Sequence, residues 1–149
     1  MQTPLMPKGV EHPDHLFVYG TLLPELAPAG WRELLSRCAR VGRGSLPGRL
    51  YDLGDYPALV PDPAAPGRVT GHVLRLPERE DVLGELDGYE GFDPADPAGS
   101  LYLRLPCDVD LDDGTRLACW VYVYNREPGE APLIPGGDYL SWLYGGTES

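Results

Sequence analysis

One acidic side chain, Glu90, stands in a setting that favours proton-transfer chemistry. It occurs in the segment LDGYEGF (residues 86–92), where glycine and aromatic residues surround it just beyond the predicted end of a helix. If Glu90 is buried there, desolvation and the negative end of the helix dipole both raise the pKa of its carboxyl group. Such a pKa suits a general base that works near neutral pH. On position alone, a solvated loop glutamate is the simpler interpretation. For the nearby Asp87 we expect a local capping or turn role rather than a place in a catalytic dyad.

A second segment, VYGTL (residues 18–22), could bind an anion. It is predicted to be a strand that ends in a glycine turn. Successive backbone N–H groups at such a turn can point into one concavity and hold a carboxylate or an oxyanion. The candidate binding residues are Tyr19, Gly20, Thr21 and Leu22. From the residues alone, an ordinary strand end with a glycine in its turn remains the alternative.

Other catalytic chemistries lack their motifs in this sequence. His12 and His15 lie in or beside the N-terminal segment without further ligands, and His72 stands alone in a predicted strand, where we expect a structural or surface role. The sequence contains no H-E-x-x-H, no G-x-S-x-G and no Walker-type phosphate loop. We therefore expect no metal and no cofactor. The cysteines are odd in number and form no C-x-x-C pair, so we expect them to be reduced and buried: Cys38, Cys107 and Cys119.

Length and charge narrow the classes of function further. The chain has 149 residues, 12 basic and 23 acidic side chains, and a formal net charge of −11. One domain is expected at this length. The negative charge disfavours nucleic acids and anionic membranes as partners, and no apolar stretch is long enough to span a bilayer. Residues 1–14 lack the apolar segment of a signal peptide, so we expect a flexible arm there and a cytoplasmic protein.

The hydrophobic pattern predicts the strands and helices that must position these candidates. Apolar runs predict strands near 15–19, 46–53, 58–60, 69–76, 101–111 and 115–124, with the last two joined as a hairpin. Helical spacing predicts helices over 31–40 and 77–88, and Asp138 is expected to cap a last short helix that carries Tyr139, Trp142 and Leu143.

These elements predict an α+β fold. Strands and helices do not alternate as repeated βαβ units, so we expect a small mixed β-barrel with two or three packed helices. The second hairpin strand is apolar on both faces, which predicts that both of its faces are covered. Residues 15–149 are predicted to form this single domain.

Four segments in order resemble the gamma-glutamyl cyclotransferase-like family, which includes gamma-glutamylamine cyclotransferases and many uncharacterised bacterial members. They are FVYGTL (17–22), GRLYDLGDYPA (48–58), LDGYEG (86–91) and YLR (102–104), and the resemblance covers about residues 15–145. It implies a small α+β barrel with a cavity lined by the Y-G-T-L turn and one essential glutamate, which matches Glu90. In the family the turn is often followed by a basic residue and a glycine, whereas Leu23-Pro24-Glu25 follows here. This loop and the loop 93–100 leave the preferred leaving group open.

The resemblance also implies an activity. Similar proteins release 5-oxoproline from a gamma-glutamyl amide: the α-amino nitrogen of the substrate attacks its own γ-carbonyl and expels an amine. This chemistry needs no metal or nucleotide. Glu90 would then act as general acid and base, while Tyr19 to Leu22 would anchor the glutamyl group.

Other roles remain open at this point. Tyr102, Tyr124 and Tyr139 are expected mainly to pack, with a place in the cavity wall as the second possibility for each. We expect a monomer or a weak dimer. The alternatives to an enzyme are a non-catalytic small-molecule-binding domain that keeps the cavity and an acidic interaction domain whose cavity is vestigial.

Overall fold

The computed structural model describes residues 13–23, 26–78 and 81–145, so the predicted arm lies almost entirely outside the described residues. The strands are β1 (His15–Val18), β2 (Ala39–Asp52), β3 (Pro57–Pro61), β4 (Arg68–Arg75), β5 (Tyr102–Leu111) and β6 (Arg116–Tyr124). The helices are α1 (Ala29–Leu35), α2 (Val82–Glu90) and α3 (Tyr139–Gly145), with a short 3-10 helix at Pro97–Gly99. None of the described helices is long and apolar enough to cross a membrane.

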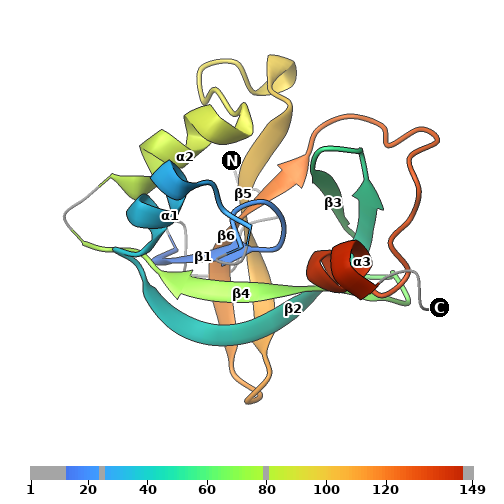
Figure 1. Ribbon diagram of the computed structural model, residues 1–149, viewed down its shortest axis with the longest axis horizontal. Helices are drawn as coiled ribbons and strands as arrows, with labels where there is room; N and C mark the ends of the chain where they lie inside the picture. Colours follow the sequence, from blue (N-terminus) through green and yellow to red (C-terminus); the bar gives the residue numbers. More distant parts are fainter. Residues whose placement is uncertain (1–12, 24–25, 79–80, 146–149) are drawn as a thin grey trace, which may run out of the picture.

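The strands form a barrel that closes through β2. They are ordered β3-β2-β4-β1-β6-β5 in one sheet of 6 strands, and an additional pairing of β2 with β5 closes the ring. The pairing of β1 with β6 is parallel, and the other ladders are antiparallel. The predicted α+β barrel with packed helices is therefore confirmed. Figure 1 shows α1 and α2 together on one side of the barrel and α3 on the other.

The longest strand, β2, serves several neighbours along its 14 residues. Its first part pairs with β4, Gly44 and Ser45 pair with β5, and its last part pairs with β3. The sequence predicted a helix up to about residue 40, which is wrong, because α1 ends at Leu35 and β2 begins at Ala39. Ladder hydrogen bonds to β4 replace the helical ones there, while Cys38 stays buried as the helical spacing required.

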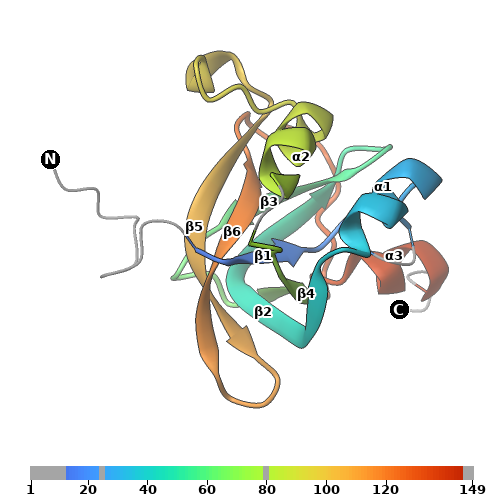
Figure 2. The ribbon, with the colours of Figure 1, turned by 90° about the vertical axis from the view of Figure 1, so that its left-hand side faces the viewer.

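Two apolar cores share the barrel wall. Alternate residues of β1 face opposite ways: Phe17 belongs to the core inside the barrel, and Leu16 and Val18 belong to a core between the barrel and α1 and α2. The same alternation along β6 places Val121 inside and Tyr122 under the helices. The prediction that both faces of this strand are covered is confirmed. Figure 2 shows α1 and α2 against the face that this second core occupies.

The position of α2 differs from its prediction at both ends. The helix begins after Asp81, whose side chain accepts a hydrogen bond from the Gly84 N–H at 2.8 Å, rather than at residue 77. It runs past Gly88 to Glu90 and ends at Gly91, which has φ +74°. Gly91 takes the left-handed conformation that terminates helices, whereas Gly88 is an ordinary helical residue. Glu90 is therefore the last residue of the helix and not part of a following loop.

The C-terminal helix covers the other end of the barrel. Asp138 accepts a hydrogen bond from the Leu140 N–H at 3.1 Å, as expected for a cap. Tyr139 is buried in the barrel core, and the indole N–H of Trp142 donates to Asp52 Oδ2 at 2.8 Å. These contacts hold α3 against β2.

The end of α2 yields a test with a matched pair of glycines. A Cβ at Gly88 meets nothing within 4 Å, so Gly88→Ala should stabilise the protein by about 0.5–1 kcal/mol through helix propensity. A Cβ at Gly91 would sit on a backbone with φ +74°, so Gly91→Ala should destabilise it by about 1 kcal/mol or more. Urea unfolding of both variants measures the difference. The opposite order would mean that the helix ends at Gly88.

Candidate active site

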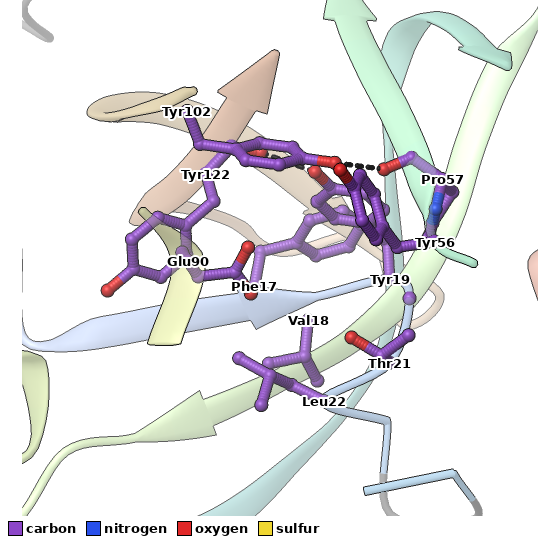
Figure 3. Close-up of a pocket in the computed structure, with 11 residues that line it drawn as sticks. Phe17, Val18, Tyr19, Thr21, Leu22, Tyr56, Pro57, Glu90, Tyr102 and Tyr122 are labelled. Atoms are coloured by element: carbon purple, nitrogen blue, oxygen red, sulfur yellow. Dashed lines mark hydrogen bonds between the residues drawn. The ribbon is translucent and has the colours of Figure 1, made fainter. Parts of the chain in front are cut away.

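A pocket opens where β1 ends, between the last turn of α2 and the barrel wall (Figure 3). Its floor comes from β1 and the turn that follows it, and its walls come from α2, from the segment before β3, and from β5 and β6. The lining residues are Phe17, Val18, Tyr19, Gly20, Thr21, Leu22, Tyr56, Pro57, Glu90, Tyr102 and Tyr122. Glu90 and the turn 19–22, which are far apart in the sequence, thus share one pocket.

Glu90 is the only carboxylic acid among the residues that line this pocket. Its carboxyl group points into the pocket from the end of α2 (Figure 3). Burial raises the pKa of Glu90 from 4.5 to about 7. Among the described residues, no hydrogen bond or ion pair holds this carboxylate. The group is therefore poised to gain or lose a proton near neutral pH.

The turn after β1 presents its backbone to the same space. Leu23 N–H donates to Gly20 C=O at 2.9 Å and closes the turn. Within the described turns and loops, Gly20, Thr21 and Leu22 donate no backbone hydrogen bond. A Cβ at Gly20 would lie 2.6 Å from Pro57 Cγ. Any larger residue would clash with this proline, so the close approach of the turn requires glycine. Free N–H groups at a turn of this kind suit a carboxylate or an oxyanion.

Tyrosines build most of the polar wall. The Tyr102 hydroxyl donates to the Pro57 carbonyl at 2.6 Å, and the Tyr19 hydroxyl donates to the Tyr122 carbonyl. Burial raises the pKa of each of these phenols, for Tyr19, Tyr102 and Tyr122, well above its ordinary value. The wall is consequently uncharged at neutral pH, which leaves Glu90 as the acid that titrates in the pocket.

The sequence predicted a local capping or turn role for the Asp87 side chain, and this prediction is wrong. Its side chain is neither a cap nor part of a turn: it is buried, with Arg104 Nε and an Arg104 terminal nitrogen at 2.7 and 3.0 Å from its carboxylate oxygens. The Tyr122 hydroxyl donates to the same carboxylate at 2.7 Å. Only the Asp87 main chain takes part in the helix end, where its carbonyl accepts the Phe92 N–H at 2.9 Å.

This ion pair fastens α2 to the barrel. Val82 and Leu86 bury the apolar face of the helix, about 1.5–3 kcal/mol for each side chain. The Arg104 guanidinium, on β5, lies 4.4 Å from the Trp120 ring centroid and adds a cation–π contact. Removing one partner of a buried pair typically costs about 3–5 kcal/mol, because the other charge is left uncompensated.

Tyr89 fixes the turn from the helix side. Its hydroxyl donates to Thr21 Oγ1 at 3.1 Å, and its ring lies 4.8 Å from that of Trp31 on α1. The last turn of α2 therefore touches the anion-binding candidate directly through Tyr89 and carries the candidate acid at the next position.

The other residues considered from the sequence fall into three groups. Tyr102 lines the pocket, whereas Tyr124 packs edge-on to it with ring centroids 5.6 Å apart, and Tyr139 lies in the barrel core. The described part of the loop 23–25 and the loop 93–100 contribute no lining residue, and residues 24 and 25 lie outside the described residues. Sequence reasoning did not name Phe17, Val18, Tyr56, Pro57 or Tyr122 as site residues. The first four lie in the segments 17–22 and 48–58 that resemble the family, and that signal could have found them, whereas Tyr122 lies in no such segment.

None of the described cysteines and histidines is among the residues that line the pocket. Cys38 and Cys119 are buried and Cys107 is partly buried, all as free thiols. Burial raises the pKa of Cys107 to about 11 and that of Cys119 to about 12, so neither is a thiolate at neutral pH. Within the described residues no group of three or more His, Cys, Asp or Glu side chains is arranged to hold a metal ion.

Burial of Glu90 predicts a measurable effect on stability. Because its pKa rises from 4.5 to about 7 on folding, the folded state binds the extra proton between these values, and stability is lost as pH rises through that window. Above pH 7 the loss is at most roughly 3 kcal/mol. Glu90→Gln should therefore be more stable than the wild type at about pH 8, with a smaller advantage at about pH 5.5. Urea unfolding at both pH values measures this; an advantage that does not grow with pH would contradict it.

Comparison with known proteins agrees with this geometry. A family model described as "Gamma-glutamyl cyclotransferase, AIG2-like" matches residues 16–141. The gamma-glutamylcyclotransferase family protein YtfP of Escherichia coli K12 is 31% identical over 126 residues, which cover 84% of this chain and 95% of that protein. The gamma-L-glutamyl-butirosin B gamma-glutamyl cyclotransferase of Niallia circulans is 31% identical over 121 residues, which cover 80% and 72% of the two chains.

A solved structure shows the same fold. The crystal structure of an AIG2-like protein from Mus musculus superimposes with a TM-score of 0.59 at 27% identity, over 79% of this chain and 82% of that one. The family match spans both the turn after β1 and the last residue of α2. The chain belongs to the gamma-glutamyl cyclotransferase, AIG2-like family.

Proposed function

We propose that the protein releases 5-oxoproline from a gamma-glutamyl amide, with Glu90 as the general acid and base. The observation that carries this proposal is the Glu90 carboxyl group, which has a pKa of about 7 and stands in one pocket with the turn 19–22. The Niallia circulans relative is named as a gamma-glutamyl cyclotransferase, which supports the class of reaction.

The reaction balances without a further reactant. The α-amino nitrogen of the substrate forms a bond to its own γ-carbonyl carbon, and the amide bond from that carbon to the leaving nitrogen breaks. The α-nitrogen enters as an ammonium group and loses two protons on the way to the ring amide. Glu90 takes the first and releases it to solvent, then takes the second on ring closure and returns it to the leaving nitrogen. The products are 5-oxoproline and a free amine, and the carboxyl group ends in its starting state.

Much of the rate acceleration would come from holding the substrate folded. Nucleophile and electrophile belong to one molecule, so a pocket that enforces the ring-closing geometry can supply about 7–11 kcal/mol of the barrier. Phe17, Tyr56 and Tyr102 enclose that space with rigid rings. A snug wall of this kind favours the bent glutamyl chain over its extended forms.

The properties of Glu90 suit both proton transfers. An α-ammonium group has a pKa of about 8, close to the value of about 7 that burial gives Glu90. Proton transfer between groups of similar pKa is efficient in either direction, which a residue that acts first as base and then as acid requires.

The turn after β1 would bind the charged part of the substrate. The N–H groups of Gly20, Thr21 and Leu22 would receive either the α-carboxylate or the oxyanion that forms on the γ-carbonyl; their residues line the pocket, which supports this role. In either case neutral N–H donors bind the negative charge of the substrate, and Glu90 remains free to change its protonation state.

The non-catalytic alternatives predict a different pocket. A vestigial cavity would be filled by side chains, with Glu90 neutralised in an ion pair. In the part of the chain that the structure describes, no ion pair neutralises Glu90, which argues against the vestigial case. A binding module that retains the pocket would still bind 5-oxoproline, and it differs from an enzyme only by the absence of turnover.

Substitution of Glu90 tests the proposal most directly. Glu90→Gln keeps the size of the side chain but cannot accept the ammonium proton, so kcat should fall by about 10²–10⁴ with little change in KM. Release of 5-oxoproline from a panel of gamma-glutamyl amides, including amino acids, peptides and amines, measures this. Glu85→Gln, an exposed position on the same helix, is the matched control and should keep wild-type rates. Near-normal turnover by Glu90→Gln would refute the mechanism, and absence of turnover on the whole panel would favour a binding module.

The pH profile tests the protonation state of the same group. The step needs an ionised Glu90, whose pKa is about 7, and a substrate ammonium group, whose pKa is about 8, so kcat/KM should rise about tenfold per pH unit below the first value and fall again above the second. Rates measured between about pH 5 and pH 9 span both pKa values. A flat profile over this range would contradict proton transfer to Glu90.

A further inference from the structure

The carboxylate of Asp87 lies behind the pocket and one helical turn before Glu90. Residues three apart on a helix lie on neighbouring positions of its surface. Contacts that hold the Asp87 side chain in place therefore also set the rotation of the last turn of α2. They thereby set the direction in which the Glu90 side chain points. The bidentate contact with Arg104 and the contact with the Tyr122 hydroxyl provide that fixation from β5 and β6.

Tyr122 connects this ion pair to the opposite side of the pocket. Its hydroxyl donates to Asp87, its ring lines the pocket, and its main-chain carbonyl accepts the hydroxyl of Tyr19. Tyr19 begins the turn 19–22, whose residues line the pocket. One residue of β6 is thus in hydrogen-bond contact with the helix that carries the acid and with the first residue of the anion-binding turn.

The ion pair also balances charge next to the pocket. The titratable groups that line the pocket with Glu90 are the phenols of Tyr19 just after β1, Tyr56 before β3, Tyr102 on β5 and Tyr122 on β6. Behind them stand the negative Asp87, on the same helix as Glu90, and the positive Arg104, on β5. Because these two charges cancel each other, neither is free to stabilise or oppose the ionised form of Glu90.

We propose that Asp87, Arg104 and Tyr122 are positioning residues for the cyclotransferase reaction, an inference that rests on the proposed function. They hold the Glu90 carboxyl group at a set place relative to the turn 19–22, and they keep the net charge behind the pocket at zero.

Charge-changing variants separate this role from a purely structural one. Asp87→Asn leaves Arg104 uncompensated and should lower the pKa of Glu90, whereas Arg104→Gln leaves Asp87 uncompensated and should raise it, each by roughly 0.5–1 unit. The double variant Asp87→Asn/Arg104→Gln removes both charges and should return the pKa close to that of the wild type. Titration of the ¹³C-labelled Glu90 carboxyl group by NMR measures these values without any need for turnover.

Tyr122→Phe tests the geometric part of the proposal. It removes only the hydrogen bond to Asp87 and retains the ring and the main-chain carbonyl, so the charges behind the pocket stay the same. We expect kcat to fall about tenfold while KM changes less than about twofold, as for a small misplacement of a reacting group. Asp62→Asn, which breaks the Arg49–Asp62 pair of 2.8 Å outside this pocket, is the matched control and should change neither constant.

The NMR titration of Glu90 and the kinetic constants of Tyr122→Phe together distinguish a positioning role from a purely structural one. Opposite pKa shifts in the single charge variants, with recovery in the double variant and a selective loss of kcat in Tyr122→Phe, would support the proposal. Variants that only lower the unfolding temperature, with the Glu90 titration and kcat unchanged, would overturn it.

If Asp87→Asn fails to fold, the double variant and Tyr122→Phe test the proposal in its place. If the wild type turns over no amide, the proposed function fails by that result alone, and the NMR titration still decides whether the ion pair sets the charge around Glu90.

Discussion

The docking of α2 on the barrel through the ion pair of Asp87 and Arg104 is the interaction on which the pocket depends. Two apolar side chains, Val82 and Leu86, bury one face of the helix, but apolar contact is non-directional and would tolerate sliding or rotation. The bidentate contact to Arg104 has a fixed geometry and allows neither. Because Glu90 is the last helical residue, a shift of the helix by one turn would remove its carboxyl group from the pocket.

Helix α2 carries two carboxylates in opposite environments, three residues apart. Asp87 receives hydrogen bonds from an arginine and a tyrosine, while Glu90 faces phenols whose hydroxyls are engaged elsewhere. The first carboxylate is compensated and stabilises the fold, and the second is desolvated and opposes folding when it ionises. Stability supplied by the first offsets the cost of the second, which is the relation expected where a protein must keep an uncompensated acid for use.

Much of the fold could be predicted from the residues. The strand pattern, the hairpin of β5 and β6, the cap at Asp138 and the barrel with packed helices are confirmed, because each rests on local periodicity or turn chemistry. The ends of α1 and α2 were wrong for the opposite reason. Residues after Leu35 follow a helical pattern but form a ladder with β4, and Gly88 is a glycine without a positive φ, so neither boundary is decided by local preference.

For the candidate site, the sequence by itself determined which groups are available: a glutamate next to glycine, a Y-G-T-L turn, and no metal-binding or nucleophile motif. Only the tertiary structure decided which of these groups share a pocket and which protonation state each favours. Whether Glu90 titrates near neutral pH depends on burial against Tyr102 and Tyr122, which follow it by 12 and 32 positions in the chain and reach it only through the barrel. The role of Asp87 likewise depends on Arg104 from another element. A pKa and an ion pair are properties of an environment in space, and neighbours along the chain supply only part of that environment.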